Sequence, residues 1–273
     1  MTFLVTGATG TVGRQIVAQL VERGLPVRAL TRNPAAARLP DGVEVACGDL
    51  TSPRTLVPAL EGVAGLHLIT FGGDDGADLE TGPEIVELAA RAGVARISVL
   101  TGWEETSVER ALREANAAWT QVWCAEFMAN AYDWLESIRD EGVVRVFGNH
   151  PSAVVHEADI AAVAVAALVG EGHAGRSYAL TGPESLTPEQ RTRLLGAAIG
   201  RELRFEELDE AGYRALMRAA GVSDDLIEFG VQLGARPPEA GAVVRPTVER
   251  VTGRPARTFA QWAAEHATAF EQP

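Results

Sequence analysis

The feature that most constrains this chain is a glycine-rich turn directly after an apolar N-terminal run. Phe3-Leu4-Val5 predicts a buried strand, and Thr6-Gly7-Ala8-Thr9-Gly10-Thr11-Val12-Gly13 follows it. Apolar residues then recur with helical spacing at Ile16, Val17, Leu20 and Val21. Glycines at this spacing between a strand and a helix let backbone N–H groups approach a phosphate at the helix N-terminus. The stretch predicts dinucleotide binding; the alternative is an ordinary glycine-rich turn.

Strands and helices alternate through the first half of the chain. Further strands are predicted at residues 27–30, 43–46, 66–70, 97–100 and 120–123, with helices between them. This alternation predicts an α/β fold, a doubly wound parallel sheet of Rossmann type. We expect residues 1–130 to form most of the dinucleotide-binding core. Residues 131–273 are expected to complete it and to add a smaller C-terminal helical substrate lobe or lid at about 201–246.

Local signals predict where several helices begin. Ser52 followed by Pro53 is typical of an N-cap and a first helical residue, although Pro58 fits poorly in the second turn. Asp159 is predicted to cap an alanine-rich helix. Capping boxes are predicted at Thr187–Gln190 and at Thr258–Gln261, where the last helix would run to about Phe270.

The carboxyl ends of parallel strands form one crevice, where ligands bind. This edge is predicted to hold the glycine turn, Arg32, Asp49 and residues 70–72, 101–103 and 124–127. No Asp or Glu lies between Val27 and Arg38 to accept hydrogen bonds from a ribose 2′-hydroxyl. Arg32 instead suits a 2′-phosphate, so NADP(H) is predicted in preference to NAD(H), which is also possible. The alternative is that Arg32 is a solvated loop residue.

Composition narrows the classes of partner. The formal net charge is −13, and every one of the 24 basic residues is arginine, because the sequence contains no lysine. This balance argues against nucleic-acid binding, which needs clustered cations. No apolar run has the ~18 residues of a membrane span, and no signal peptide is recognisable. With Cys47 and Cys124 expected to be free thiols, a cytoplasmic protein is predicted.

We interpret the other notable polar residues as structural rather than functional. Asp74, Asp75 and Asp78 follow glycines, and we interpret them as an exposed turn rather than a metal site. No metal is therefore predicted. His156 is interpreted as a packed or capping residue, with a catalytic role as the alternative.

Several motifs, taken in order, resemble one family. They are residues 6–13, Leu30-Thr31-Arg32-Asn33-Pro34, Gly48-Asp49-Leu50, Trp119-Thr120 with Phe127-Met128-Ala129-Asn130, His156-Glu157-Ala158-Asp159-Ile160-Ala161, and 180–187. Together they resemble the NmrA-like atypical short-chain dehydrogenase/reductases over nearly the whole chain. The glycine motif is common to many families, whereas the ordered set is far more specific.

The resemblance implies a set of cofactor-binding residues. The pyrophosphate would be held by Gly7, Thr9, Gly10, Thr11, Val12 and Gly13. Arg32 and Asn33 would meet the 2′-phosphate, and Asp49 and Leu50 the adenine. Thr70, Phe71 and Gly72 would flank the central riboses.

One departure from the family pattern concerns catalysis. Active short-chain dehydrogenases use a Ser/Thr with a Tyr-x-x-x-Lys, in which the tyrosine donates a proton and the lysine lowers its pKa. This chain has no lysine, and its tyrosines, Tyr132, Tyr178 and Tyr213, lie outside the expected helix. Thr101 could fill the Ser/Thr position. It would then contact the cofactor, and it is the one catalytic candidate that the family pattern offers.

Three hypotheses about function follow. The first is an NADPH-dependent reductase of an aromatic or quinone-like carbonyl compound whose own hydroxyl stabilises the alkoxide, similar to tyrosine-less antibiotic ketoreductases such as that for simocyclinone. Trp103, Phe127, Tyr132 and Trp134 could stack on such a substrate, although most are expected to be core. The second is a non-catalytic NAD(P)-binding sensor that regulates a partner protein. The third is an isomerase or epimerase. No oligomeric state is predicted.

Overall fold

The computed structural model describes residues 1–72 and 77–271. Within them the chain divides into two compact units, each assembled from separate segments. Unit 1 comprises Met1–Cys124, Glu157–Leu180 and Thr247–Arg254. Unit 2 comprises Ala125–His156, Thr181–Pro246 and the described residues from Pro255 onward.

Unit 1 is built on a parallel sheet, seven-stranded in the described part of the chain, with the order β10-β8-β7-β4-β1-β2-β3. The strands are β1 (Thr2–Val5), β2 (Val27–Thr31), β3 (Glu44–Cys47), β4 (Val63–Ile69), β7 (Arg96–Thr101), β8 (Trp119–Cys124) and β10 (Ser177–Leu180). From β1 the chain builds outward first through β2 and β3, and then on the other side through β4. The order therefore reverses between β1 and β4, where a doubly wound sheet opens its ligand crevice. The predicted fold class is confirmed.

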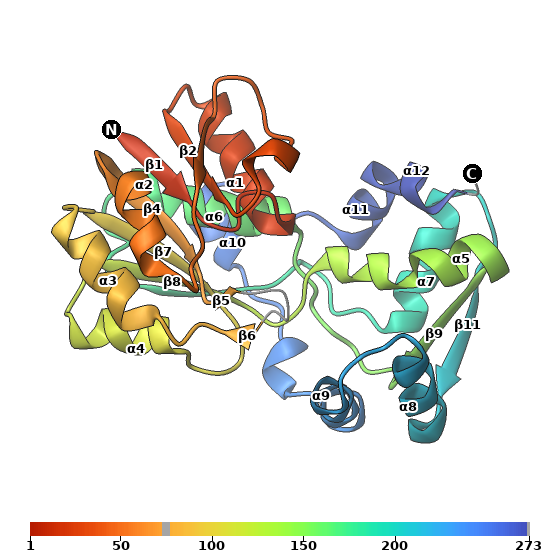
Figure 1. Ribbon diagram of the computed structural model, residues 1–273. Helices are drawn as coiled ribbons and strands as arrows, with labels where there is room; N and C mark the ends of the chain where they lie inside the picture. The colour runs from red at the N-terminus through yellow and green to blue at the C-terminus, as the bar shows by residue number, and fades with distance from the viewer. Residues whose placement is uncertain (73–76, 272–273) are drawn as a thin grey trace. The chain divides into compact units, whose positions relative to one another are not determined.

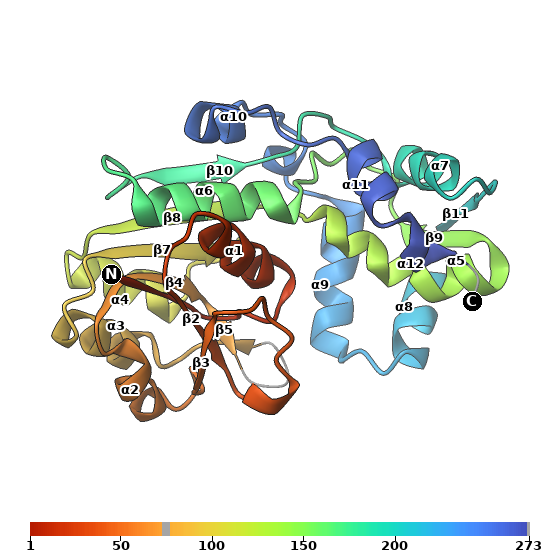
Figure 2. The same cartoon turned by 90° about the horizontal axis from the view of Figure 1, so that it is seen from above.

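Helices cover both faces of this sheet. They are α1 (Thr11–Glu22), α2 (Val57–Leu60), α3 (Gly82–Arg91), α4 (Ser107–Glu114), α6 (Glu157–Val169) and α10 (Thr247–Thr252), with 3₁₀ turns η1 (Pro34–Ala36) and η2 (Pro53–Leu56). Figures 1 and 2 show α1 and α6 together on one face and α2, α3 and α4 on the other. On the second face, Leu66, Leu68 and Val99 pack against Ile85 and Leu112. A short antiparallel pair, β5 (Phe71–Gly72) and β6 (Ala77–Asp78), follows β4.

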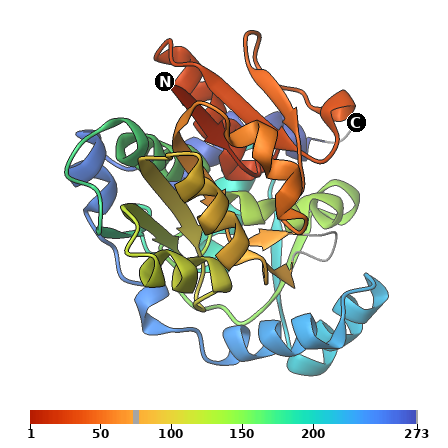
Figure 3. The same ribbon diagram turned by 60° about the vertical axis from the view of Figure 1, so that its left-hand side comes forward.

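Unit 2 is mainly helical. Its elements are η3 (Met128–Trp134), α5 (Leu135–Glu141), β9 (Val143–Phe147), α7 (Pro188–Ala198), β11 (Arg204–Leu208), α8 (Glu210–Ala219), α9 (Asp224–Ala235), η4 (Glu239–Gly241), α11 (Phe259–Glu265) and α12 (Ala267–Phe270). Its core gathers Ile138, Leu195, Phe259, Trp262 and Phe270. Helices α8 and α9 pack on each other (Figure 3). The predicted lobe at 201–246 contains β11, α8, α9 and η4.

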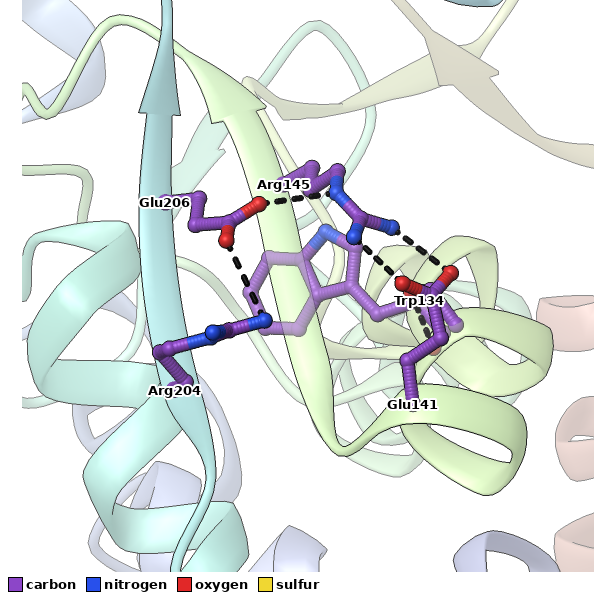
Figure 4. A network of polar contacts seen from close by, with 6 residues as sticks. Trp134, Glu141, Arg145, Arg204 and Glu206 are labelled. Carbon is purple, nitrogen blue, oxygen red and sulfur yellow. Dashed lines mark hydrogen bonds and ion pairs between the residues drawn. The ribbon is translucent and has the colours of Figure 1, made fainter.

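A charged network fastens the parallel pair β9–β11 to α5 (Figure 4). Arg145 on β9 donates to both carboxylate oxygens of Glu141, at 2.9 and 2.5 Å, and its Nε donates to Glu206 on β11 at 2.9 Å. Arg204 pairs with the other oxygen of Glu206 at 3.2 Å. These bonds lower the pKa of Glu141 and raise that of Arg145. The network therefore ties three elements of unit 2 together at its surface.

Two of the predicted helix boundaries need correction. The alanine-rich helix α6 begins at Glu157, so Asp159 lies inside its first turn and is not the N-cap. The last predicted helix is interrupted at His266, which separates α11 from α12. The poor fit of Pro58 also has a visible consequence: the predicted helix starts as the 3₁₀ turn η2 and continues only through the short α2. The two capping boxes, at Thr187 and Thr258, are confirmed.

Candidate cofactor site

The glycine turn joins β1 to α1 at the point where the strand order reverses. Gly7 has a φ of +59°, a left-handed conformation that glycine adopts without strain, and its carbonyl accepts from Gly10 N at 2.9 Å. A Cβ added at Gly13 would overlap the backbone of Gly7 and Ala8, so glycine is needed there for α1 to approach the turn. Gly10 caps α1 without a side chain, which leaves the helix N-terminus to a ligand.

A cavity of about 400 Å³ opens beside this turn. It is lined by Gly7, Thr9, Gly10, Leu30, Thr31, Arg32, Asn33, Ala36, Ala37, Gly48, Asp49, Leu50, Ile69, Phe71 and Gly72. These residues come from the carboxyl ends of β1, β2, β3 and β4 and the turns that follow them. A backbone cradle for phosphate, a cationic rim and an apolar wall are what an adenine dinucleotide requires, so the residues present fit that cofactor.

The rim at the end of β2 carries the predicted 2′-phosphate residues. Arg32 is exposed and lines the cavity. Asn33 caps the turn η1 by accepting from Ala36 N at 3.3 Å. Asp49, after the neighbouring strand β3, also lines the cavity, and its Oδ1 accepts from both the backbone and the hydroxyl of Thr51, at 2.9 and 2.8 Å. This acidic side chain therefore closes its own turn, while Arg32 supplies positive charge to the rim.

The other predicted cofactor residues take different positions. Phe71 and Gly72 line the cavity, whereas Thr70 is buried, and its carbonyl accepts from Leu79 N at 2.9 Å. Val12 and Gly13 are buried at the start of α1, and Thr11 is exposed there; the cavity wall does not include these three residues.

Thr101, the catalytic candidate, ends β7 and is 4% exposed. Its hydroxyl accepts from Gln121 Nε2 at 3.2 Å, and the same amide nitrogen donates to Glu109 at 3.1 Å. Gln121 Oε1 in turn accepts from Ser177 at 2.6 Å. Sequence reasoning missed Gln121; the only available signal was its place between Trp119 and Trp123 on one face of β8. Thr101 therefore belongs to a polar network that runs from buried Thr101 and Glu109 to exposed Ser177, and it does not line the cavity.

The predicted substrate-stacking aromatics fall in both units. In unit 1, Trp103 packs edge-on against Trp123, with ring centroids 5.0 Å apart. In unit 2, Phe127 packs against the core and forms a bridge with Val155. Tyr132, 37% exposed, stacks on Phe270 and contacts the rings of Trp262 and His266.

Trp134, also of unit 2, lies under the guanidinium of Arg191 at 5.4 Å. The buried side chain of Arg191 donates to Glu126 at 2.5 Å. The Trp134 ring is therefore already packed against a cation of the same chain, Arg191.

The tyrosines and His156 have structural partners. Tyr178 hydrogen-bonds His173 Nδ1 at 2.8 Å, and burial raises the pKa of Tyr213, which makes it a poorer acid. His156 is buried, with Nε2 3.2 Å from Glu265. These contacts agree with the interpretation of His156 as a packed residue.

Residues 1–72 and 77–271 hold no group of three or more His, Cys, Asp or Glu side chains arranged for a metal. Of the aspartates considered for one, Asp78 is exposed, and Asp74 and Asp75 lie outside the described residues. In the part of the chain that the structure describes, no helix has the length and apolar character to cross a membrane. Cys47 is an exposed and Cys124 a buried free thiol.

A parallel sheet with a glycine turn and a cavity at its reversal point defines a Rossmann-type dinucleotide-binding protein. Residues 7–141 match the NAD(P)H-binding protein family. The chain is 41% identical to a (4-alkanoyl-5-oxo-2,5-dihydrofuran-3-yl)methyl phosphate reductase of Streptomyces griseus and 36% identical to an NAD(P)H azoreductase of Xenophilus azovorans, over 98% of each chain. In fold it resembles the Escherichia coli quinone oxidoreductase QOR2 complexed with NADPH, with a TM-score of 0.81, 24% identity and coverage of 96% of this chain and 99% of that one.

The chain therefore belongs to the NmrA-like family and is an NAD(P)H-dependent reductase. This confirms the expected dinucleotide cofactor and the expected class of enzyme.

Proposed function

We propose that this reductase prefers NADPH and reduces a conjugated or aromatic carbonyl compound that delocalises the developing negative charge itself. The observation that carries the proposal is a cavity whose residues fit an adenine dinucleotide, in a chain without a lysine. The Tyr–Lys proton donor of ordinary short-chain dehydrogenases cannot form here. When bound, NADPH supplies a hydride and becomes NADP⁺; the accompanying proton must come from the substrate or from water.

The chain's own residues would bind and orient rather than donate a proton. The turn at Gly7–Gly10 and the rim at Arg32 would fix the dinucleotide, and positioning alone lowers a barrier by several kcal/mol. Suitable acceptors are quinones, ortho-hydroxyaryl ketones of polyketide type, and unsaturated lactones of the kind named for the 41% identical relative. In each of them the added electron pair spreads onto an oxygen that is conjugated or internally hydrogen-bonded.

A matched pair of substrates tests this idea. NADPH oxidation is followed by absorbance with an ortho-hydroxyaryl ketone and with its methyl ether, which lacks the internal donor. We expect kcat to fall about 100-fold for the ether, the usual size of a lost proton donor. In the same assay, Thr101→Val should change kcat less than about threefold, because Thr101 is buried and does not line the cavity.

Three results would count against the proposal. Equal rates for ketone and ether would remove the substrate's hydroxyl from the mechanism, and a large loss in Thr101→Val would return the donor to Thr101. Tight NADPH binding with no oxidation by ketones, quinones or lactones would instead favour the sensor, the function that the missing Tyr–Lys pair also allows.

A further inference from the structure

Arg14, in the first turn of α1, folds its side chain back onto the glycine turn. Its Nη2 donates to the carbonyl of Thr9 at 2.7 Å, and its Nε donates to the carbonyl of Gly10 at 3.2 Å. Thr9 and Gly10 both line the cavity. The charged guanidinium of Arg14 therefore hydrogen-bonds directly to peptide groups of the cavity wall.

These bonds hold two peptide planes. The Gly10 carbonyl also accepts from the backbone N–H of Arg14 at 3.1 Å, so two donors fix its direction. Because a trans peptide is planar, its N–H points opposite to its C=O, and fixing the Gly10 carbonyl fixes the N–H of Thr11. That N–H is among the first four of α1, which have no acceptor within the helix and serve phosphate binding.

The position of the charge also suits an anion. The first turn of α1 contains no acidic residue. The positive end of the helix dipole is a poor place for a cation unless negative charge is bound beside it. A pyrophosphate at the turn supplies that charge, and it is common to NADPH and NADH.

We propose that Arg14 is a positioning residue for the dinucleotide pyrophosphate, while Arg32 serves the 2′-phosphate. The inference rests on the proposed NADPH site and is independent of the substrate. Arg14 clamps the carbonyls of Thr9 and Gly10, so that the N–H of Thr11 is already aimed before the cofactor arrives. Arg14 thereby favours the binding of NADPH and NADH equally, whereas Arg32 favours NADPH, which alone carries the 2′-phosphate.

Binding of two fragments to the full-length protein, measured by calorimetry, tests this division. Both ligands contain adenosine. ADP has the pyrophosphate without the 2′-phosphate, and adenosine 2′-monophosphate has the 2′-phosphate without the pyrophosphate. We expect Arg14→Met to weaken ADP about tenfold, the size of one lost charge-assisted contact, and to leave adenosine 2′-monophosphate within twofold. Arg32→Ala should weaken adenosine 2′-monophosphate about tenfold and leave ADP within twofold. NADH affinity should fall in Arg14→Met only.

Arg23→Met is the matched control, because Arg23 is an exposed arginine at the C-terminal end of the same helix. It removes the same charge and should leave both fragments within twofold. Arg14→Lys keeps the charge but offers one flexible nitrogen in place of the two fixed nitrogens that reach the Thr9 and Gly10 carbonyls, so it should recover less than half of the lost ADP binding. Thermal unfolding without ligand should show every variant folded.

The proposal is overturned if Arg14→Met behaves like Arg23→Met towards ADP. It is also overturned if Arg14→Met weakens adenosine 2′-monophosphate as much as ADP, or if Arg14→Lys binds ADP like the wild type. A wild-type chain that bound neither fragment would instead refute the cofactor site itself. The test measures ligand binding and thermal unfolding and no catalysis, so it does not depend on turnover.

Discussion

His67, on the central strand β4, is fully buried in the sheet. Its Nδ1 lies 2.8 Å from the Ser98 hydroxyl on β7, and its Nε2 has no hydrogen-bond partner among the described residues. Burial lowers the pKa of His67 to about 3, so the folded protein keeps the imidazole neutral. An unfolded chain exposes it with an ordinary pKa of about 6.5. Below that pH the unfolded state binds a proton that the folded state refuses, and stability falls as the pH drops from 6.5 towards 3.

We therefore expect His67 to cost the protein about 2 kcal/mol of unfolding free energy between pH 7.5 and pH 5. His67→Gln retains a polar partner for Ser98 but cannot titrate. Urea unfolding at the two pH values should show the wild type losing about 2 kcal/mol more than this variant. Equal losses in the two proteins would mean that the imidazole titrates alike folded and unfolded.

At the scale of elements, α4 depends on a carboxylate that serves both a helix and a strand. Glu109 accepts from the Thr106 backbone N–H at 3.0 Å, which caps α4, and from Gln121 on β8 at 3.1 Å. It is 5% exposed. Glu109→Ala would leave buried donors unpaired and should lower the free energy of unfolding by about 1–3 kcal/mol. Glu109→Gln retains an acceptor and should lose less than half as much in chemical denaturation. A similar loss in both variants would point to the charge rather than to the hydrogen bonds.

Sequence predicted those elements whose signals are local. The capping boxes at Thr187 and Thr258 and the first strand–turn–helix depend on neighbouring residues, and they appear as expected. The prediction of Asp159 as an N-cap was wrong because α6 is buried on nearly all sides. The helix therefore gives no amphipathic pattern from which to place its start.

Long-range contacts explain what sequence missed. The strand β11, rich in charge, was not predicted because Glu206 finds its partner, Arg145, on β9. Gln121 was missed for the same reason, since its partners Thr101, Glu109 and Ser177 are 12 to 56 residues away. Strand ends in a parallel sheet converge whatever their side chains, and Gly7, Arg32 and Asp49 line the cavity as this rule predicts. Residues 101–103 and 124–127, which were expected at the same edge, do not line it.

At the scale of the whole molecule, unit 1 is completed by residues that are far in sequence from its candidate cofactor cavity. The described residues that line the cavity all come before position 73, yet α6 packs on α1 and on β4, β7 and β8, and β10 pairs with β8. Ile160, Val163, Val165 and Leu168 of α6 are 0% exposed. Burial of four such side chains is worth roughly 6–12 kcal/mol, which is comparable with the entire stability of a domain.

A fragment of residues 1–141, which contains every residue of the family match, should therefore fail to fold. Without α6, one face of the sheet keeps only α1 as its cover, and β8 becomes an unpaired edge. We expect no cooperative thermal transition by circular dichroism and no ADP binding at concentrations that saturate the full chain. The full-length protein in the same buffer is the control. A fragment that unfolds cooperatively and binds ADP with full-length affinity would show that the cradle needs only its local strands and turns; α6 would then be a cover for the sheet rather than a condition of its folding.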